Sequence, residues 1–321
     1  VGRLECPRRE PVQETSEKIR EILNGFGLNE VITYSFLDAR SLEMLGESDL
    51  YSPDTAPRIA NPVNKSQSLL RPTLIPGLLE VINRNLNHHQ DRIEIFEIGT
   101  VFEKRNRVLL PREEFRLVLG LYRKEGESDW TGESEIFGFH SLKSLLEIVF
   151  DRPGVKGPVF QPVPHPVFQP GQSAAIKWGG EIVGYAGAVA DPVIDAFSLA
   201  APLYLAEIDM GPLINADEKA VSYRPLPQYP AVGRDMAVIV DEEVPFEELR
   251  EAIEKHRPEL LKEFKLFDYY RGDPIPAGKK SFAFRLKYRS DRGTLCEETI
   301  NKIHRAFQED LRSELGCGFR E

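Results

Sequence analysis

"LFDYYRGDPIPAGKKSFAFRLKYRS" (266–290) decides the fold of the second half of the chain. Two runs of strand-forming residues flank a segment rich in Gly and Pro, which is the pattern of an antiparallel hairpin. Basic residues gather over 279–292 around a single acid, Asp291; they are Lys279, Lys280, Arg285, Lys287, Arg289 and Arg292. The sequence therefore predicts a hairpin that carries aromatic and cationic side chains together.

The residues on either side of this hairpin complete a recognisable order. "GRDMAVIVDEEV" predicts a strand, and "PFEELREAIEKHR" predicts a helix with Pro245 in its first turn. "TLCEETINKIHRAFQEDLRSELG" predicts a second helix, capped by Thr294 and ended by Gly316, before a short last strand in "CGFRE". This is the ferredoxin-like β-α-β-β-α-β pattern, whose helices cover one sheet face and leave the other free to bind a ligand.

The first two-thirds of the chain predicts a separate α+β domain with a largely antiparallel sheet. Apolar periodicity there indicates helices over 14–24, 78–88 and 137–150, strands over 30–36, 92–105, 114–123 and 202–213, and a hairpin over 171–190. Gly179 and Gly180 supply the positive φ angles of the hairpin turn. Gly25 or Gly27 supplies the left-handed cap of the first helix. The proline-rich stretch 214–230 predicts the link to the second domain.

Composition bounds the class of protein. A chain of 321 residues with 41% hydrophobic and 29% charged residues is typical of two soluble globular domains. No apolar run approaches the ~18 residues of a membrane helix, and "VGRLECPRREPV" lacks the design of a signal peptide. Three widely spaced cysteines indicate reduced thiols, so we expect a cytoplasmic protein without a metal site.

The charge is divided unevenly along the chain. The net charge is -10, yet residues 223–321 hold 18 basic and 19 acidic residues. Cations beside Tyr269, Tyr270 and Phe284 suit single-stranded RNA, whose phosphates attract cations and whose bases stack on flat rings. A structural interpretation also fits, because strands favour aromatic residues and an exposed Lys prevents edge pairing.

Several motifs, in matching order and separation, resemble one family across nearly the whole chain. They are "ITYSF" (32–36), "SLLRPTLIPGLLEVINRN" (68–85), "IEIFEIGTVF" (93–102), "PGQSAAI" (170–176), "RPLPQYPAVGRDMAVIV" (224–240) and "LFDYYRG" (266–272). Together they are similar to the C-terminal half of the bacterial phenylalanyl-tRNA synthetase β subunit.

The resemblance implies a domain organisation and a role. Residues 14–215 would form a class II synthetase-like core without catalytic function, and 223–321 a ferredoxin-fold anticodon-binding domain. Residues 1–13 and 216–222 would be linkers, the first from an upstream domain. The whole enzyme joins phenylalanine to tRNA(Phe) with ATP and Mg²⁺ as an (αβ)₂ heterotetramer, and the α subunit carries the active site. The family's editing domain and its Mg²⁺-binding acids precede this region and are not assigned to it.

The chain agrees with a loss of catalysis. Class II chemistry uses arginines that hold ATP phosphates, and the late "GxGxxxR" context is absent here. Arg116 stands before alternating Leu and Val, which indicates a sheet-edge or ion-pair residue. Arg71, in "SLLRPTLIPGLL", is either a candidate for contact with the α subunit or a residue hydrogen-bonded to a loop carbonyl. We expect no catalytic residue, cofactor or metal in this chain.

The resemblance also places an anticodon site. It implies that Tyr270 contacts the first anticodon base, that Asp268 and Ser281 offer polar contacts to bases nearby, and that Arg320 reaches the same face. Lys280, Arg285 and Lys287 would hold the RNA backbone. Alternation puts residues 268 and 270 on one side of their strand.

Two other functions compete with this one. The chain could be a scaffold for α subunits that touches no RNA. A stand-alone ferredoxin-like enzyme such as an acyl phosphatase would need a phosphate-cradling loop, and "PAVGRDMA" has Arg234 but no such loop.

Overall fold

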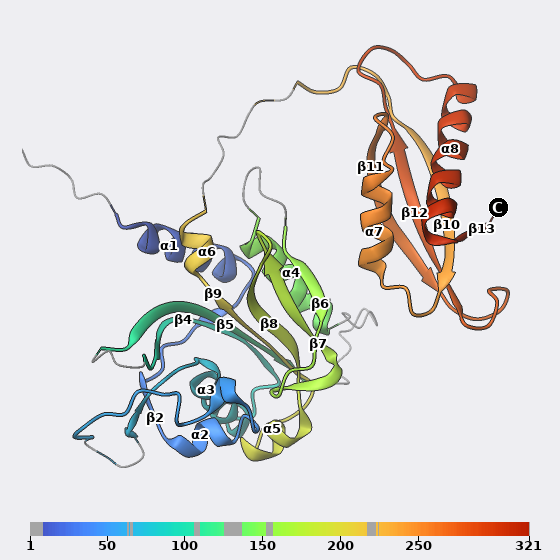
Figure 1. Cartoon of the computed structure of the whole chain (residues 1–321). Helices are drawn as coiled ribbons and strands as arrows, with labels where there is room; N and C mark the ends of the chain where they lie inside the picture. The colour runs from blue at the N-terminus through green and yellow to red at the C-terminus, as the bar shows by residue number, and fades with distance from the viewer. Residues whose placement is uncertain are drawn as a thin grey trace, which may run out of the picture. The chain divides into compact units, whose positions relative to one another are not determined.

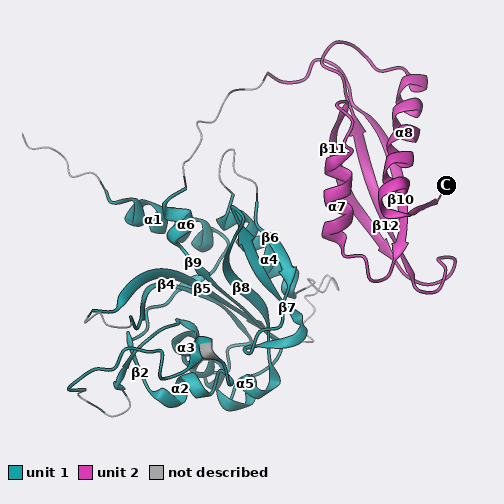
Figure 2. Cartoon of the chain, in the orientation of Figure 1, with its two compact units in different colours: residues 1–221 teal, residues 222–321 magenta. Residues whose placement is uncertain are grey.

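The computed structural model describes residues 9–62, 64, 67–105, 110–124, 137–151, 157–216, 223 and 225–320. The chain divides into two compact units, residues 1–221 and 222–321 (Figure 2). The second unit therefore begins one residue before the start expected from the sequence.

A seven-stranded sheet forms the centre of the first unit, in the order β1-β4-β5-β9-β8-β7-β6 (Figure 1). Its strands are β1 (Asn29–Glu30), β4 (Arg92–Glu103), β5 (Arg112–Arg123), β6 (Val159–Pro162), β7 (Phe168–Trp178), β8 (Glu181–Val189) and β9 (Leu203–Asp209). Every neighbouring pair is antiparallel except β1 with β4. The expected antiparallel sheet is confirmed.

Both faces of this sheet are buried. Along β5, Val118 belongs to one apolar cluster, while Leu117 and Leu119 belong to another, as alternation requires. The first cluster packs under α3 (Ile75–Asn87) and α5 (Asp191–Ala196). The second packs under α1 (Pro11–Gly25), α4 (Phe139–Val149) and α6 (Gly211–Ile214).

Short elements lie between β1 and α3. They are β2 (Phe36–Leu37), α2 (Ala39–Glu43), a 3₁₀ turn (Asp49–Tyr51) and β3 (Leu69–Leu70), which pairs with β2.

The strand expected over 30–36 is wrong except at its ends. The parallel ladder with β4 ends where the Val31 N–H donates to the Phe96 carbonyl at 2.8 Å. Beyond it, the Thr33 N–H donates to the Glu97 carboxylate at 3.2 Å instead of to a neighbouring strand. The segment is therefore held partly by a side chain.

Helix boundaries differ from expectation where proline starts a helix. α1 begins at Pro11 rather than at residue 14, and α3 begins at Ile75 rather than at residue 78, with Pro76 in its first turn. Proline lacks an N–H and has a helical φ, so it is accommodated at this position. Gly27 has the positive φ expected near the end of α1 (88°), and Gly179 and Gly180 have those expected in the hairpin.

The second unit has the predicted order of elements. They are β10 (Val232–Asp241), α7 (Phe246–Lys255), β11 (Leu261–Tyr270), β12 (Lys279–Tyr288), α8 (Glu297–Leu315) and β13 (Gly318–Arg320). The strands form an antiparallel sheet in the order β11-β12-β10-β13. The ferredoxin-like pattern is confirmed.

Two caps in this unit correct the sequence interpretation. Pro245 is the residue before α7 rather than part of its first turn, and Cys296 rather than Thr294 precedes α8. Gly316 ends α8 in the left-handed conformation (φ 60°), as expected.

Within the described ranges, no helix has the length and apolar character needed to cross a membrane, and no group of three or more His, Cys, Asp or Glu side chains could hold a metal ion. Cys296 is exposed and Cys317 is buried, and both are free thiols; Cys6 lies outside the described residues.

Candidate functional site

One face of the second unit's sheet is covered by its helices, and the other is not. On β12 the apolar side chains belong to the core shared with α7 and α8; they are Phe282, Phe284, Leu286 and Tyr288. Because side chains alternate, the intervening residues lie on the opposite face. That opposite face, named the open face from here on, carries Ser281, Ala283, Arg285 and Lys287.

Four of the predicted site residues meet on this open face. Tyr270 pairs with Ser281, and Asp268 pairs with Ala283 on the next rung. Arg320 pairs with Ala237, which itself pairs with Ala283. Cross-strand partners share a face, so all four residues belong to the open face, although they are spread across the sheet from β11 to β13. Ser281 is only 6% exposed, so neighbouring side chains cover most of it.

A β-bulge decides that these residues face outward. Leu266 pairs with Phe284 on the helix-covered face, whereas Asp268 pairs with Ala283 on the open face. Phe267 is the extra residue between these two pairs, and it breaks the alternation of β11. If β11 alternated regularly through Phe267, Asp268 and Tyr270 would point the same way as Leu266, toward the helices.

Tyr270 presents its ring at the end of β11. Its hydroxyl donates to the Asp273 carbonyl at 2.6 Å, in the turn that follows the strand. The side chain is 42% exposed, so one part of the ring is anchored while another is available to a ligand.

Two of the expected phosphate contacts already have carboxylate partners. Arg285 donates two hydrogen bonds to Asp235, at 2.9 and 3.0 Å, and this pairing lowers the pKa of Asp235. Lys287 Nζ lies 2.8 Å from Glu263 Oε2, and this hydrogen bond lowers the pKa of Glu263. Both pairs are solvent-exposed, so RNA phosphates could exchange with these carboxylates at small cost.

Lys280 does not belong to the open face, and the expectation for it is wrong. Its Nζ lies 5.5 Å from the centroid of the Phe282 ring, on the other side of β12. The residue is 7% exposed, and its pKa is lowered by burial and by Arg271. The basic run in the sequence is thus divided between the two faces by alternation.

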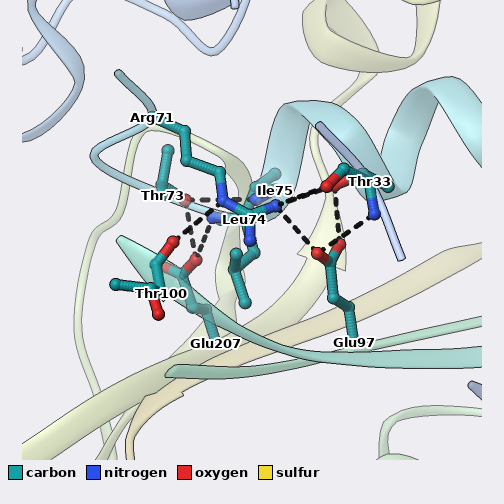
Figure 3. Close-up of polar contacts among 8 residues, drawn as sticks. All are labelled: Thr33, Arg71, Thr73, Leu74, Ile75, Glu97, Thr100 and Glu207. Atoms are coloured by element: carbon teal, nitrogen blue, oxygen red, sulfur yellow. Dashed lines mark hydrogen bonds and ion pairs between the residues drawn. The ribbon is translucent and has the colours of Figure 1, made fainter. Parts of the chain in front are cut away.

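Arg71 lies inside the first unit (Figure 3). Its Nη1 is 2.8 Å from Glu97 Oε1 and 2.9 Å from Thr33 Oγ1, and its Nε donates to the Thr100 carbonyl at 2.9 Å. Arg71 is 5% exposed and Glu97 1%. The structure therefore favours the loop-carbonyl alternative and corrects the proposal of an α-subunit contact through this side chain.

Arg116 forms ion pairs, as the sequence indicated, although β5 is not a sheet edge. Its guanidinium lies 2.9 Å from Glu207 and 3.3 Å from Glu114, which raises its pKa. The other oxygen of Glu207 accepts from Thr73 Oγ1 (2.8 Å) and the Leu74 N–H (2.7 Å) at the start of α3 (Figure 3).

A cavity of about 440 Å³ lies over these strands. The charged side chains among its described lining residues are Glu103, Glu114, Arg116, Glu207 and Asp209. His165, which also lines it, is uncharged at neutral pH because burial lowers its pKa to about 4. Four carboxylates and one paired arginine make this a cavity of negative charge.

Sequence reasoning missed an apolar line on the surface of the first unit. Ile32 is 88% exposed, Tyr34 79% and Phe36 45%, while the alternate residues Thr33 and Ser35 are half-buried. The alternation in "VITYSF" was visible in the sequence, but its apolar side faces outward. Exposed apolar side chains that recur at alternate positions make this segment a candidate interaction surface.

Sequence comparisons agree with these two units. Residues 2–210 match the family model "Phenylalanyl tRNA synthetase beta chain CLM domain", and residues 227–320 match "Ferredoxin-fold anticodon binding domain".

Similar proteins include phenylalanine–tRNA ligase beta subunits of three bacteria. That of Syntrophotalea carbinolica is 32% identical over 321 residues, which are 100% of this chain and 40% of the relative. That of Halalkalibacterium halodurans is 35% identical over 96% of this chain and 38% of the relative. That of Geobacillus kaustophilus is 32% identical over 97% and 38%. The chain thus spans about 40% of the length of these relatives.

Among solved structures, a pyrrolysyl-tRNA synthetase from Desulfitobacterium hafniense covers 63% of this chain and 65% of its own, with TM-score 0.48 and 19% identity. The family assignment rests on the sequence matches: this chain belongs to the phenylalanyl-tRNA synthetase beta chain family and carries a ferredoxin-fold anticodon-binding domain.

Proposed function

We propose that this chain is the part of a phenylalanine–tRNA ligase that holds the α subunit and binds the anticodon region of tRNA(Phe). The reaction of ATP, phenylalanine and tRNA would then take place in the α subunit, with ATP and Mg²⁺ bound there. The assembly would be a cytoplasmic (αβ)₂ heterotetramer.

The observation that carries the proposal is the meeting of Tyr270, Asp268, Ser281 and Arg320 on one open sheet face. An exposed ring stacks on an unpaired base, and a carboxylate accepts hydrogen bonds from base amino groups. The exposed Arg320 adds contacts to base edges or phosphates. The face therefore offers both the stacking and the polar groups that recognition of a single-stranded anticodon needs.

The charge of the first unit's cavity supports a non-catalytic core. A nucleotide triphosphate needs cations around its phosphates. The cavity instead gathers four carboxylates, and two of them engage the guanidinium of Arg116. Such a lining repels ATP.

The apolar line of Ile32, Tyr34 and Phe36 supports the scaffolding part of the proposal. Burying these side chains against a protein partner removes apolar surface from water at roughly 25 cal/mol per Å². It replaces Arg71 as the interface candidate. The double substitution Ile32→Ser and Tyr34→Ser should reduce co-purification with the α subunit, whereas Tyr223→Ser, at another exposed side chain, should not.

A scaffold without RNA contact remains the second candidate, and the paired state of Arg285 and Lys287 favours it. A titration separates the two. The chain is mixed with an anticodon stem-loop carrying GAA, and with one carrying a swapped anticodon, at two salt concentrations. Tighter, salt-dependent binding to GAA supports recognition by this chain.

No binding to either RNA, with or without added α subunit, would favour the scaffold. Tyr270→Ala should weaken binding to the GAA stem-loop by ~1–3 kcal/mol, because one base loses its stacking partner. Unchanged affinity in this variant would remove Tyr270 from the site.

A further inference from the structure

Phe267, the extra residue of the β-bulge, forms part of the open face. It is 49% exposed, which is unusual for a phenylalanine next to a strand core. The Cζ of Arg285 lies 5.0 Å from the centroid of its ring. Since Arg285 belongs to the open face, Phe267 lies there too, beside Asp268.

Asp235 orients the guanidinium of Arg285. Its Nε and Nη2 donate to the two oxygens of Asp235, the cross-strand neighbour on β10. The raised pKa of Arg285 follows from the same pair. The charge of Arg285 is thus balanced within the domain, while the flat guanidinium lies over an aromatic ring. Guanidinium planes and aromatic rings are both surfaces on which RNA bases stack.

We infer that Phe267 and Arg285 form a second stacking position, for an unpaired RNA base other than the one that contacts Tyr270. This inference rests on the proposed function and extends it. Phe267 and Tyr270 are three residues apart on β11, which is at most about 10 Å at 3.3 Å per residue. Stacked bases lie about 3.4 Å apart, so a base stacked on one ring does not stack on the other, and the two positions receive different nucleotides of the same loop.

The inference assigns Arg285 a role that differs from a phosphate contact. A phosphate contact needs only a charge, and lysine supplies it. A stacking position needs the plane, and only arginine supplies it. Arg285→Lys retains a cation beside Asp235, so the substitution removes the plane without changing the charge of the face.

The first test measures binding of the full chain to the GAA stem-loop. We expect Phe267→Ala and Arg285→Lys each to weaken binding by about fivefold to a hundredfold, with an unchanged dependence on salt. Phe267→Tyr should bind like the unchanged chain. Tyr269→Ala is the matched control, because Tyr269 is the next aromatic on β11 but faces Phe282 on the other side of the sheet.

The second test locates the bases. Stem-loops carry 2-aminopurine at one unpaired position at a time, and its emission falls when it is stacked. Phe267→Ala should restore emission at one position, and Tyr270→Ala at a different one. If both variants restored the emission of 2-aminopurine at the same single position, the inference would be overturned.

The two proposals fail in distinguishable ways. If Tyr270→Ala weakens binding while Phe267→Ala and Arg285→Lys stay within twofold of the unchanged chain, only the second stacking position is wrong. If the unchanged chain does not bind the stem-loop in the presence of the α subunit, the proposed function fails, and the inference fails with it.

Discussion

The sheet of the first unit is buried on both faces, whereas the sheet of the second unit is buried on one. This difference changes what a charged residue in a strand can do. In the first unit Glu97 of β4 lies in the core with Arg71 as its partner. In the second unit Arg285 pairs with Asp235 in solvent, where either partner can exchange for a ligand. The same type of ion pair stabilises the core in the first sheet and is accessible to a ligand in the second.

The largest effect should come from breaking the buried pair. Glu97→Gln leaves Arg71 charged and unpaired inside the first unit, and we expect a loss of about 3–5 kcal/mol in the free energy of unfolding. Trp178 is buried in this unit, and the sequence has no tryptophan after residue 221, so tryptophan fluorescence during urea unfolding reports on it.

The control is Glu103→Gln on the same strand, where the carboxylate is 63% exposed and 3.9 Å from Arg112. Equal, small losses in both variants would show that burial does not distinguish the pairs.

A second effect concerns the pH dependence of the first unit's stability, which a buried histidine should influence. Burial among aromatic rings lowers the pKa of His165 to about 4, from about 6.5 in an unfolded chain. The unfolded state therefore binds a proton more readily between these values, so this histidine destabilises the first unit as pH falls from 6.5 to 4. The free energy of unfolding that is lost in this way is at most about 3 kcal/mol. His165→Gln should flatten this part of the stability–pH curve, and an unchanged slope would assign it to other groups.

A smaller effect concerns the backbone of the second unit. Gly316 ends α8 at φ 60°, where a Cβ is strained, so Gly316→Ala should cost roughly 1–2 kcal/mol. Hydrogen exchange of the α8 amides measures it. Gly293→Ala is the matched control, since Gly293 also has open space around its Cβ position but no left-handed φ. Equal protection in both variants would argue against strain at the cap.

The smallest effect should come from the exposed pair on the open face. Lys287→Met removes the partner of Glu263, and we expect no resolvable change in the unfolding of the second unit, because both side chains are about half-exposed. A loss comparable to that of Glu97→Gln would mean that the open face is structurally as constrained as the buried sheet.

The order of elements in the second unit could be predicted because each strand and helix has its own period and its own Gly or Pro boundary. The partner of Arg71 could not. It is Glu97, 26 residues away, and only the packed fold brings the two together. The prediction for Lys280 was wrong for a related reason. A run of basic residues does not by itself show on which face of the strand each side chain lies.

The face on which Tyr270 lies could not be predicted from the sequence either. Alternation showed that Asp268 and Tyr270 share a side, but that side depends on one unpaired residue. The exposed Ile32, Tyr34 and Phe36 show the reverse problem, since the apolar half of an alternating segment is normally the buried half.

The bulge at Phe267 lets β11 carry one more side chain on the open face than a regular strand would. Leu266 and Asp268 pair with consecutive residues of β12, so Phe267 is added without changing the face of any residue on either side of it. Deletion of Phe267 would therefore leave Asp268 and Tyr270 on the open face and remove only its ring and the local bend. The bulge is thus the place where this strand can change its length by one residue while the side chains around it keep their faces.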